Sequence, residues 1–319
     1  MSNQKKFIVS HAPFWHNGSG IPERSYNIMI AALPAVLVGI AYFGIPALGV
    51  ICLSISSAIG WELLMNRATR RPFLVGDGHS AMIGMLFGML LPATAPWWLV
   101  IIGTFLAVVI GKEIFGGIGS NPFNPAVLAC AILMVSWQVR MDFDTALANM
   151  DLPFTAAFPL TAIKNFGGAA AADFNLVDLF LGHQIGGIGT TCGLALIIGG
   201  LYLMFRGFIR WEIVLSFLAS IVIFATLFKI IDPTNFASPW IHLLSGYTLF
   251  GAIFLATEDS SSPVNFIPMI IYGALGGLMT ILIRNIGTDV DGVIFALLIA
   301  NLFNPLVDKI RPTALGKAV

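Results

Sequence analysis

The chain has few charged residues for its length. Only 10 % of its 319 residues are Asp, Glu, Lys or Arg, whereas 57 % are hydrophobic and the mean hydropathy is +0.90. A soluble domain carries about 25 % charged residues, so this chain lacks the polar surface that would coat a water-soluble globule. Its 16 basic and 16 acidic residues balance, which argues against the clustered basic surface that nucleic-acid binding requires.

Cysteines and catalytic motifs are also scarce. Cys52, Cys130 and Cys192 lie in apolar stretches without C-x-x-C spacing, a pattern typical of small buried side chains. Iron–sulfur ligation within the chain would need about four thiolates, so we expect no metal centre. The sequence contains no nucleophile triad, Walker loop or dinucleotide fingerprint. Any redox chemistry therefore requires a bound cofactor.

Long apolar runs, in contrast, are abundant. Ten segments approach the length of about 20 apolar residues that crosses a bilayer. They are 27–44, 46–64, 79–93, 96–113, 124–140, 187–206, 209–230, 240–257, 265–284 and 290–308. The sequence therefore predicts an all-α integral membrane protein of about ten transmembrane helices. The polar residues 1–26 precede no short apolar run with a small-residue cleavage site, so we expect no cleavable signal peptide.

Basic residues are distributed unevenly between these segments. If the N-terminus is inside, the inner segments hold 12 Lys and Arg residues and the outer segments hold four. This asymmetry predicts a multi-pass protein of the inner (cytoplasmic) membrane with both termini in the cytoplasm. The long acidic segment 141–186 then lies outside, and loops of this length usually have a function.

Two similar motifs indicate an internal repeat. Residues 121–127 read Asn-Pro-Phe-Asn-Pro-Ala-Val, and residues 301–307 read Asn-Leu-Phe-Asn-Pro-Leu-Val; a weaker similarity links 80–84 to 245–249. Two five-helix halves of opposite orientation would form an inverted repeat, whose functional site lies where the halves meet. The predicted divisions are the N-terminal segment 1–26, the first repeat 27–140, the external loop 141–186, the second repeat 187–308 and the tail 309–319.

The amides of the first motif are candidate ligand-binding groups. Asn121 and Asn124 are three residues apart, a spacing that places both amides on one face of a helix. Amides inside a membrane are costly without hydrogen-bond partners. They would therefore bind a flat heterocycle, coordinate a cation or cap a helix end, and the sequence leaves all three open.

A glycine-rich stretch precedes the sixth predicted helix. Residues 182–191 read Gly-His-Gln-Ile-Gly-Gly-Ile-Gly-Thr-Thr. Glycines and hydroxyls before a helix, here Gly187, Thr190 and Thr191, can receive a phosphate on backbone N–H groups. The alternative is a tight turn that returns the chain into the membrane.

Four carboxylates near predicted helix ends are candidates for a cation path: Glu113, Glu258, Asp259 and Asp291. Ordinary pairing with basic residues at the membrane interface is the alternative, since Lys112 adjoins Glu113. Glu258 and Asp259 are the better candidates because residues 256–263 contain no basic residue.

Five segments together resemble a known family. They are Ser10–Pro13, Gly116–Ala126, His183–Gly193, Ala256–Pro263, and Asp291–Val293 leading to Asn301–Pro305. Over nearly its whole length the chain resembles the D subunits of Rnf ion-translocating ferredoxin:NAD+ oxidoreductases, which are related to the B subunit of the sodium-pumping NADH:quinone reductase. The resemblance implies a ten-helix inverted-repeat fold. It also implies a membrane subunit that passes electrons through bound flavin between partner subunits and couples this to cation translocation.

The resemblance further implies two flavin sites. Family members join FMN through its phosphate to a threonine in the external loop, within a pattern close to Ser/Thr-Gly-Ala-Thr-Pro-Leu. Here Thr155 begins that pattern, but Phe158 occupies the acceptor position before Pro159, and a phenyl ring cannot form a phosphoester. We therefore expect FMN without a covalent link at these residues. The resemblance suggests riboflavin as a second flavin, in contact with Asn121 and Asn124.

The function has alternatives that the residues alone leave open. An inverted repeat with short glycine-rich helices also suits a channel or transporter for small solutes. A structural anchor subunit without flavin is a third interpretation. In the family interpretation the chain is one subunit of a multi-subunit oxidoreductase rather than an enzyme by itself.

Overall fold

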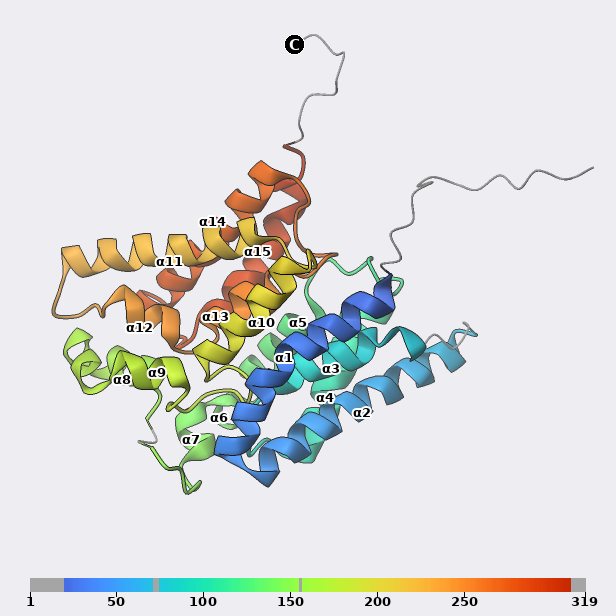
Figure 1. Ribbon diagram of the computed structural model, residues 1–319, viewed down its shortest axis with the longest axis horizontal. Helices are drawn as coiled ribbons and strands as arrows, with labels where there is room; N and C mark the ends of the chain where they lie inside the picture. Colours follow the sequence, from blue (N-terminus) through green and yellow to red (C-terminus); the bar gives the residue numbers. More distant parts are fainter. Residues whose placement is uncertain (1–19, 71–74, 155–156, 311–319) are drawn as a thin grey trace, which may run out of the picture.

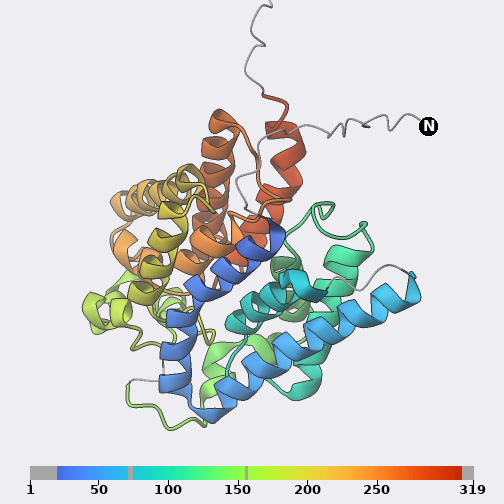
Figure 2. The same ribbon diagram turned by 45° about the vertical axis from the view of Figure 1, so that its right-hand side comes forward.

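The computed structural model describes residues 20–70, 75–154 and 157–310. Within these ranges the regular structure is helical and contains no β-strand, as the sequence predicts. The helices pack into one bundle, with the first helices of the chain along one side and the last helices along the other (Figures 1 and 2).

Four helices are long and apolar enough to cross a membrane. They are α1 (Ile21–Phe43), α2 (Ile45–Ala68), α11 (Trp211–Ile231) and α14 (Phe266–Asn285). At a rise of about 1.5 Å per residue, a helix of about 21 residues matches a hydrocarbon core about 30 Å thick. Four shorter apolar helices accompany them: α3 (His79–Leu90), α5 (Pro125–Ser136), α10 (Gly193–Phe205) and α15 (Val293–Val307). The described chain is therefore a multi-pass helical membrane protein.

Three predicted segments are less regular than their hydropathy indicates. The fourth is α4 (Trp97–Phe105), which continues as the π-helix η2 (Leu106–Glu113). The eighth is broken into α12 (Pro239–Leu244), α13 (Thr248–Phe250) and the π-helix η4 (Gly251–Leu255). The break falls at Gly246, whose φ of 67° is one that glycine adopts without strain. The sixth predicted helix, 187–206, begins only at Gly193, because the residues before it form a non-helical turn.

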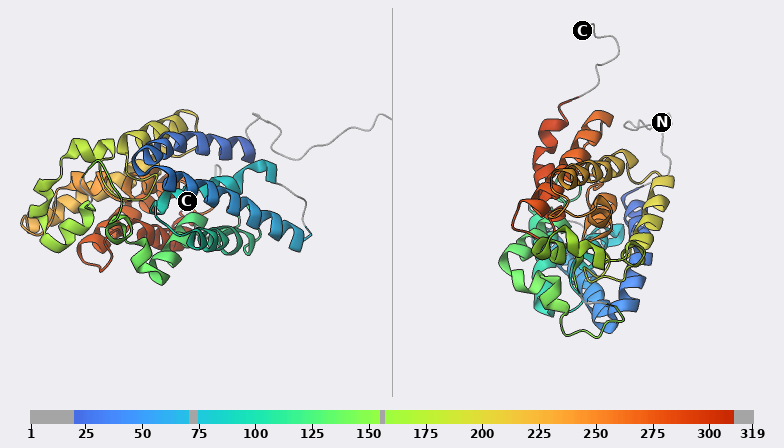
Figure 3. Two further views of the ribbon diagram at one scale, coloured as in Figure 1. Left: turned by 90° about the horizontal axis from the view of Figure 1, so that it is seen from below. Right: turned by 90° about the vertical axis from the view of Figure 1, so that its left-hand side faces the viewer.

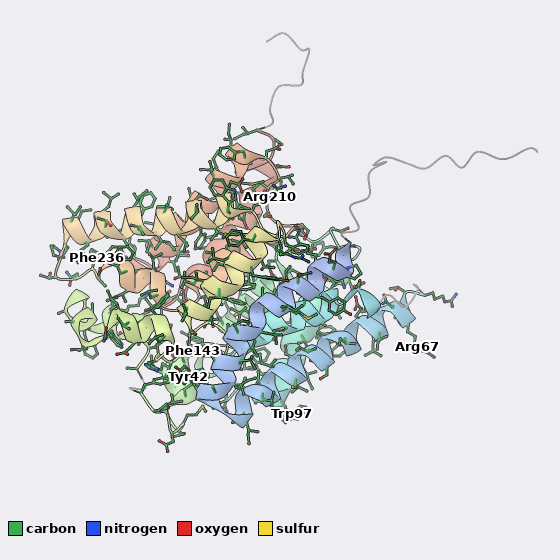
Figure 4. The ribbon with its side chains drawn as sticks, in the orientation of Figure 1. Tyr42, Arg67, Trp97, Phe143, Arg210 and Phe236 are labelled. Carbon is green, nitrogen blue, oxygen red and sulfur yellow. The ribbon has the colours of Figure 1, made fainter. Side chains whose placement is uncertain are left out.

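Residues 138–181, which include most of the segment predicted to be external, form short helices. They are α6 (Gln138–Met141), α7 (Phe143–Leu147), α8 (Pro159–Phe166), the 3-10 helix η3 (Gly168–Asp173) and α9 (Leu176–Leu181). A further 3-10 turn, η1 (Val75–Asp77), precedes α3. Figure 3 shows α8 and α9 at one end of the molecule and the end of α2 at the opposite end. Arg67 and Phe236, predicted to lie on opposite sides of the membrane, are likewise far apart (Figure 4).

Glycines allow neighbouring helices to approach closely. A Cβ atom on Gly84 would lie 2.7 Å from the Ser54 carbonyl oxygen of α2, and one on Gly199 would lie 2.1 Å from the Ala31 carbonyl oxygen of α1. Helices in lipid lack a hydrophobic driving force for association. Small residues let their backbones approach closely, so that van der Waals packing can hold them together. Gly84 and Gly199 thus each mark a close contact between two helix backbones.

The two asparagine motifs lie at opposite ends of their helices. Asn121 and Asn124 precede the first turn of α5, whereas Asn301 lies in the second half of α15 and Asn304 in its last turn, next to Pro305. The interpretation of these motifs as equivalent positions of a repeat is therefore wrong. An inverted repeat has to be argued from other features.

Replacing Gly39 of α1 by alanine is expected to destabilise the fold by about 1–3 kcal/mol, because the contact between α1 and the turn before α10 leaves no room for another methyl group. A Cβ atom there would lie 1.9 Å from the Ile188 carbonyl oxygen. The measurement is the thermal unfolding midpoint of the detergent-solubilised chain. Gly49→Ala is the control, since a Cβ atom on Gly49 would meet nothing within 4 Å. Equal unfolding midpoints of the two variants would contradict the close contact.

Candidate functional site

The C-terminal end of α3 lies deep in the bundle, where its last carbonyl groups need partners. Met89, Leu90 and Leu91 are completely buried. The Met89 carbonyl accepts a hydrogen bond from the Gly189 N–H at 3.0 Å, and the Leu91 carbonyl accepts one from the Ile188 N–H at 3.0 Å. The Leu90 carbonyl accepts one from the Tyr247 hydroxyl, at 2.9 Å. The last carbonyl groups of α3 thus receive their hydrogen bonds from the second half of the chain. The donors are the turn before α10 and the hydroxyl of Tyr247, which precedes α13.

Glycine is required in this turn because the two backbones touch. A Cβ atom on Gly187 would lie 2.7 Å from the Met89 carbonyl oxygen. The Thr190 N–H donates to the Gly187 carbonyl, so the N–H groups of residues 188 to 190 all have partners within the protein. Thr190 and Thr191 are buried. In this conformation those three N–H groups are not available to a phosphate, and the geometry favours the alternative of a tight turn back into the membrane.

A buried ion pair holds the broken helix of the second half. Asp291 accepts a hydrogen bond from the Arg284 guanidinium at 2.8 Å and another from the Tyr247 N–H at 2.6 Å. Arg284 also donates to the His242 carbonyl at 2.7 Å and to the Thr248 hydroxyl at 2.8 Å. The sequence places Arg284 in an external loop and Asp291 on a cation path. The structure instead buries both side chains and pairs them.

A second buried cluster surrounds Lys112 in η2. Its ammonium group lies 2.5 Å from a Glu62 carboxylate oxygen, 2.9 Å from the Ser80 hydroxyl and 3.5 Å from a Glu113 carboxylate oxygen. The side chain of Lys112 is only 1 % exposed, although Lys112 is one of the 12 basic residues counted as inner. The pairing of Glu113 with Lys112 is present, and both side chains are buried. The Lys112 ammonium thus lies between two buried carboxylates, one from α2 and one from the end of η2.

The sequence argument missed Glu62. The signal was available, because an ionisable residue within an apolar 24-residue helix is expensive and is therefore a candidate functional residue. What the sequence could not supply was its partner, since Lys112 lies 50 positions further along the chain.

Residues 258–261 bring the two asparagine motifs together. Asn121 donates to a Glu258 carboxylate oxygen at 3.2 Å, and Asn304 donates to the Ser261 carbonyl at 2.9 Å. Asp259 forms an ion pair with Arg24 of α1. The acidic segment therefore has no basic residue near it in the sequence, but it has one in the folded chain. The expectation that it lacks a basic neighbour is wrong.

Asn124 caps α5 and joins it to the second half. Its side-chain oxygen accepts hydrogen bonds from the N–H groups of Ala126 and Val127, at 3.0 and 3.3 Å, and its side-chain nitrogen donates to the Leu255 carbonyl at 3.0 Å. Among the three open interpretations, this geometry favours a helix cap for Asn124. Asn121 differs, because within the described part of the chain its buried side-chain oxygen has no hydrogen-bond partner.

A cavity of about 330 Å³ lies beside Phe158. Its lining comes from the end of α5, from α6, α7 and α8, from Tyr247 and from residues 288–291. Phe158 is buried, and its ring centroid lies 5.2 Å from that of Phe143, which in turn lies 5.7 Å from that of Tyr247. The hydroxyl of Thr161 also lines the cavity and, in the residues described, lacks a hydrogen-bond partner. Thr155 lies outside the described residues.

A smaller cavity of about 90 Å³ adjoins the acidic segment. Arg24, His79, Ile118, Gly119 and Glu258 are among the residues that line it. It lies close to Asn121 through the shared contact with Glu258. It would have to enlarge to admit a three-ring heterocycle such as a flavin, since ligand pockets measure about 300–1,000 Å³.

Apolar helices that pair part of the buried non-helical backbone with one another, together with buried ion pairs, define a polytopic membrane protein. Residues 8–316 match the sequence profile of the NQR2, RnfD, RnfE family. The chain therefore belongs to this family.

Two known relatives are similar to this chain over nearly their whole length. The D subunit of the ion-translocating oxidoreductase complex of Cronobacter sakazakii is 34 % identical, and the match covers 97 % of this chain and 99 % of the relative. The D subunit of the Na+-translocating ferredoxin:NAD+ oxidoreductase complex of Acetobacterium woodii is 35 % identical, with coverage of 96 % and 94 %. The similarity is thus to the D subunits of such complexes.

Replacing Asp291 by asparagine is expected to lower the free energy of unfolding by about 3–5 kcal/mol, because it leaves the Arg284 charge buried and uncompensated. The measurement is chemical or thermal unfolding in detergent. Glu23→Gln is the control, since it breaks the exposed 3.4 Å pair with Arg206 and should cost less than about 1 kcal/mol. Similar losses in the two variants would show that burial does not determine the strength of the Arg284–Asp291 pair.

Proposed function

We propose that this chain is a membrane subunit of an ion-translocating oxidoreductase complex, in which it carries electrons through bound flavin and contributes to the cation path. The observation that carries the proposal is the full-length similarity to the D subunits of the complexes in Cronobacter sakazakii and Acetobacterium woodii. The other subunits of such a complex are its expected partners, and the inner membrane is its expected location.

We assign FMN to the cavity beside Phe158, held without a covalent link. The cavity's volume of about 330 Å³ suits a small ligand, and Phe158, Phe143 and Tyr247 supply aromatic surface around it. An aromatic contact adds about 0.5–1.5 kcal/mol beyond the burial of area. The unpartnered hydroxyl of Thr161 can hydrogen-bond to an isoalloxazine edge, which both donates and accepts. Bound there, FMN would supply the one- and two-electron chemistry that the side chains lack.

Riboflavin near Asn121 stays a prediction of the family resemblance. The unpartnered side-chain oxygen of Asn121 supports it, whereas the small volume of the adjacent cavity and the complete hydrogen bonding of Asn124 do not. If riboflavin binds, Asn121 is the amide that remains able to contact it.

The two buried clusters support an inverted repeat and a cation path. In each half a basic residue of the fourth span contacts a hydroxyl of the third: Lys112 contacts Ser80 near the start of α3, and Arg284 contacts Thr248 after the break that follows α12. Such a pairing on opposite sides of the membrane fits two five-helix halves of opposite orientation. Glu113 and Glu62 would form one station of the path and Asp291 another, with Glu258 and Asp259 near the cytoplasmic opening.

A revised count of Lys and Arg residues still favours the orientation with both termini in the cytoplasm. Once the buried residues Lys112 and Arg284 are removed from the 12 inner and four outer basic residues, 11 and three remain. The positive-inside bias is therefore unchanged.

We expect no FMN mass increment on the denatured wild-type polypeptide, whereas Phe158→Thr should gain one FMN when the flavin transferase is coexpressed. The reason is that the phosphoester requires a hydroxyl oxygen at residue 158. The measurement is intact-mass spectrometry. Phe143→Thr is the control, because it places a hydroxyl on the same cavity outside the motif and should gain nothing.

Two results would contradict this assignment. An FMN adduct on wild-type chain that maps to Thr155 or Thr161 would mean that the acceptor is another hydroxyl. The chain can also be purified natively in a complex with all its partner subunits. If it then shows no flavin absorbance, the channel or anchor interpretation is favoured.

Asn124→Leu is expected to lower stability by about 0.5–2 kcal/mol through loss of the helix cap, while the flavin content of the folded protein stays unchanged. Asn124→Ser, which keeps a capping oxygen, is the matched variant and should unfold close to wild type. The measurements are the unfolding midpoint and the ratio of extracted flavin to protein. Loss of flavin at unchanged stability would instead make Asn124 a cofactor ligand.

A further inference from the structure

A third cavity, of about 500 Å³, lies next to the Phe158 cavity, between α8, the turn after α11, α12 and α14. We call it the His242 cavity. Its lining residues are Leu160, Ile163, Lys164, Asn165, Phe166, Gly167, Asn235, Phe236, His242, Arg284, Asn285 and Val290. It shares only Val290 with the lining of the Phe158 cavity. Phe236, on its rim, marks the position in Figure 4.

Three buried donor groups on its wall have no partner in the described structure. Both ring nitrogens of His242 are unpaired, although the residue is only 2 % exposed. Arg284 is 5 % exposed, and its Nε–H is unpaired even though its terminal nitrogens make four hydrogen bonds. The side-chain nitrogen of Asn285 is the third. A buried donor without a partner costs about 1–3 kcal/mol, so a ligand with several acceptor oxygens would fit this wall.

Lys164 adds a charged donor at the same cavity. Its ammonium group donates to the backbone carbonyl of Asp289 rather than to a carboxylate. Burial lowers the pKa of Lys164, and the nearby Asp289 carboxylate offsets part of this effect. The ammonium is therefore partly desolvated, which strengthens its attraction for an anion in the cavity.

The charge balance at the cavity favours an anion. None of the described residues that line it is acidic. Asp291 neutralises Arg284 from the side of the Phe158 cavity, and Asp289 also lines that cavity. Lys164, His242, Arg284 and Asn285 thus line the His242 cavity, and both nearby carboxylates, Asp289 and Asp291, line the Phe158 cavity instead.

The surroundings place this cavity at an apolar surface. Ile231, at the end of α11, and Phe166, on the rim, are each 78 % exposed. Exposed apolar side chains next to a polar cavity are typical of the boundary between the acyl chains and the headgroups of a bilayer.

We infer that the His242 cavity binds a phosphoryl group through Lys164, His242, the Nε–H of Arg284 and Asn285. Charge-assisted hydrogen bonds from ammonium and guanidinium groups are the usual means of holding phosphate oxygens. The group belongs either to an anionic phospholipid headgroup or to a small soluble phosphate. The inference is independent of the flavin proposal, because no residue that contacts this anion is needed for FMN.

The test uses the full-length chain in detergent, titrated with inorganic phosphate against sodium chloride of equal ionic strength. Phosphate is expected to raise the unfolding midpoint, and Lys164→Gln should weaken the apparent phosphate affinity about tenfold. Lys229→Gln is the matched control, since Lys229 is an exposed lysine near the end of α11 that does not line the cavity. His242→Gln, which retains a donor, should bind more tightly than His242→Leu.

A second arm separates the two sources. The same variants are reconstituted in nanodiscs of phosphatidylcholine with or without phosphatidylglycerol, and bound lipid is counted by native mass spectrometry. A lipid headgroup is identified if the wild-type chain and Lys229→Gln retain phosphatidylglycerol and Lys164→Gln does not. A soluble phosphate is identified if the chain responds to inorganic phosphate alone. If neither probe responds to Lys164→Gln in protein that still elutes as a single folded species, the inference is overturned.

Discussion

The pairing of backbone groups inside the apolar layer is the constraint on which the rest of this structure depends. α3 ends far from water, and its last carbonyls would cost several kcal/mol each if left unpaired in lipid. The turn before α10 and the Tyr247 hydroxyl provide the missing donors. Residues about 100 to 160 positions apart in the chain therefore have to meet, and this meeting joins the two halves.

Buried charge follows from the same geometry. Where a span is short or broken, polar backbone is exposed within the bundle and a long basic side chain can reach it. Arg284 satisfies the carbonyls of His242 and Ser245 at the break after α12, and Asp291 neutralises it. Lys112 differs, because it donates to the Ser80 hydroxyl near the start of α3 rather than to backbone carbonyls, and Glu62 and Glu113 supply the negative charge. Among the described residues, the Arg284–Asp291 pair is therefore the ion pair that accompanies an interrupted helix.

Helix α8 contributes to two neighbouring cavities of different chemistry. Phe158, before its first turn, and Thr161 line the cavity that contains aromatic rings. Lys164 lines the second cavity, whose described lining contains no acidic residue. Under the proposed flavin assignment, Phe158 excludes a phosphoester at its position and adds its ring to the aromatic surface of Phe143 and Tyr247.

The membrane class, the four long helices and the membership of the family were readable from the sequence, because hydropathy and motif order are properties of neighbouring residues. The breaks were not readable: Gly246, the π-helices and the late start of α10 arise where apolar segments meet partners from the other half. The same holds for Glu62 with Lys112, for Arg24 with Asp259, and for the unpaired donors around His242. Each of these features depends on which groups, far apart in the sequence, come within about 3 Å of one another where water is excluded. Only the tertiary structure decides which groups meet in this way.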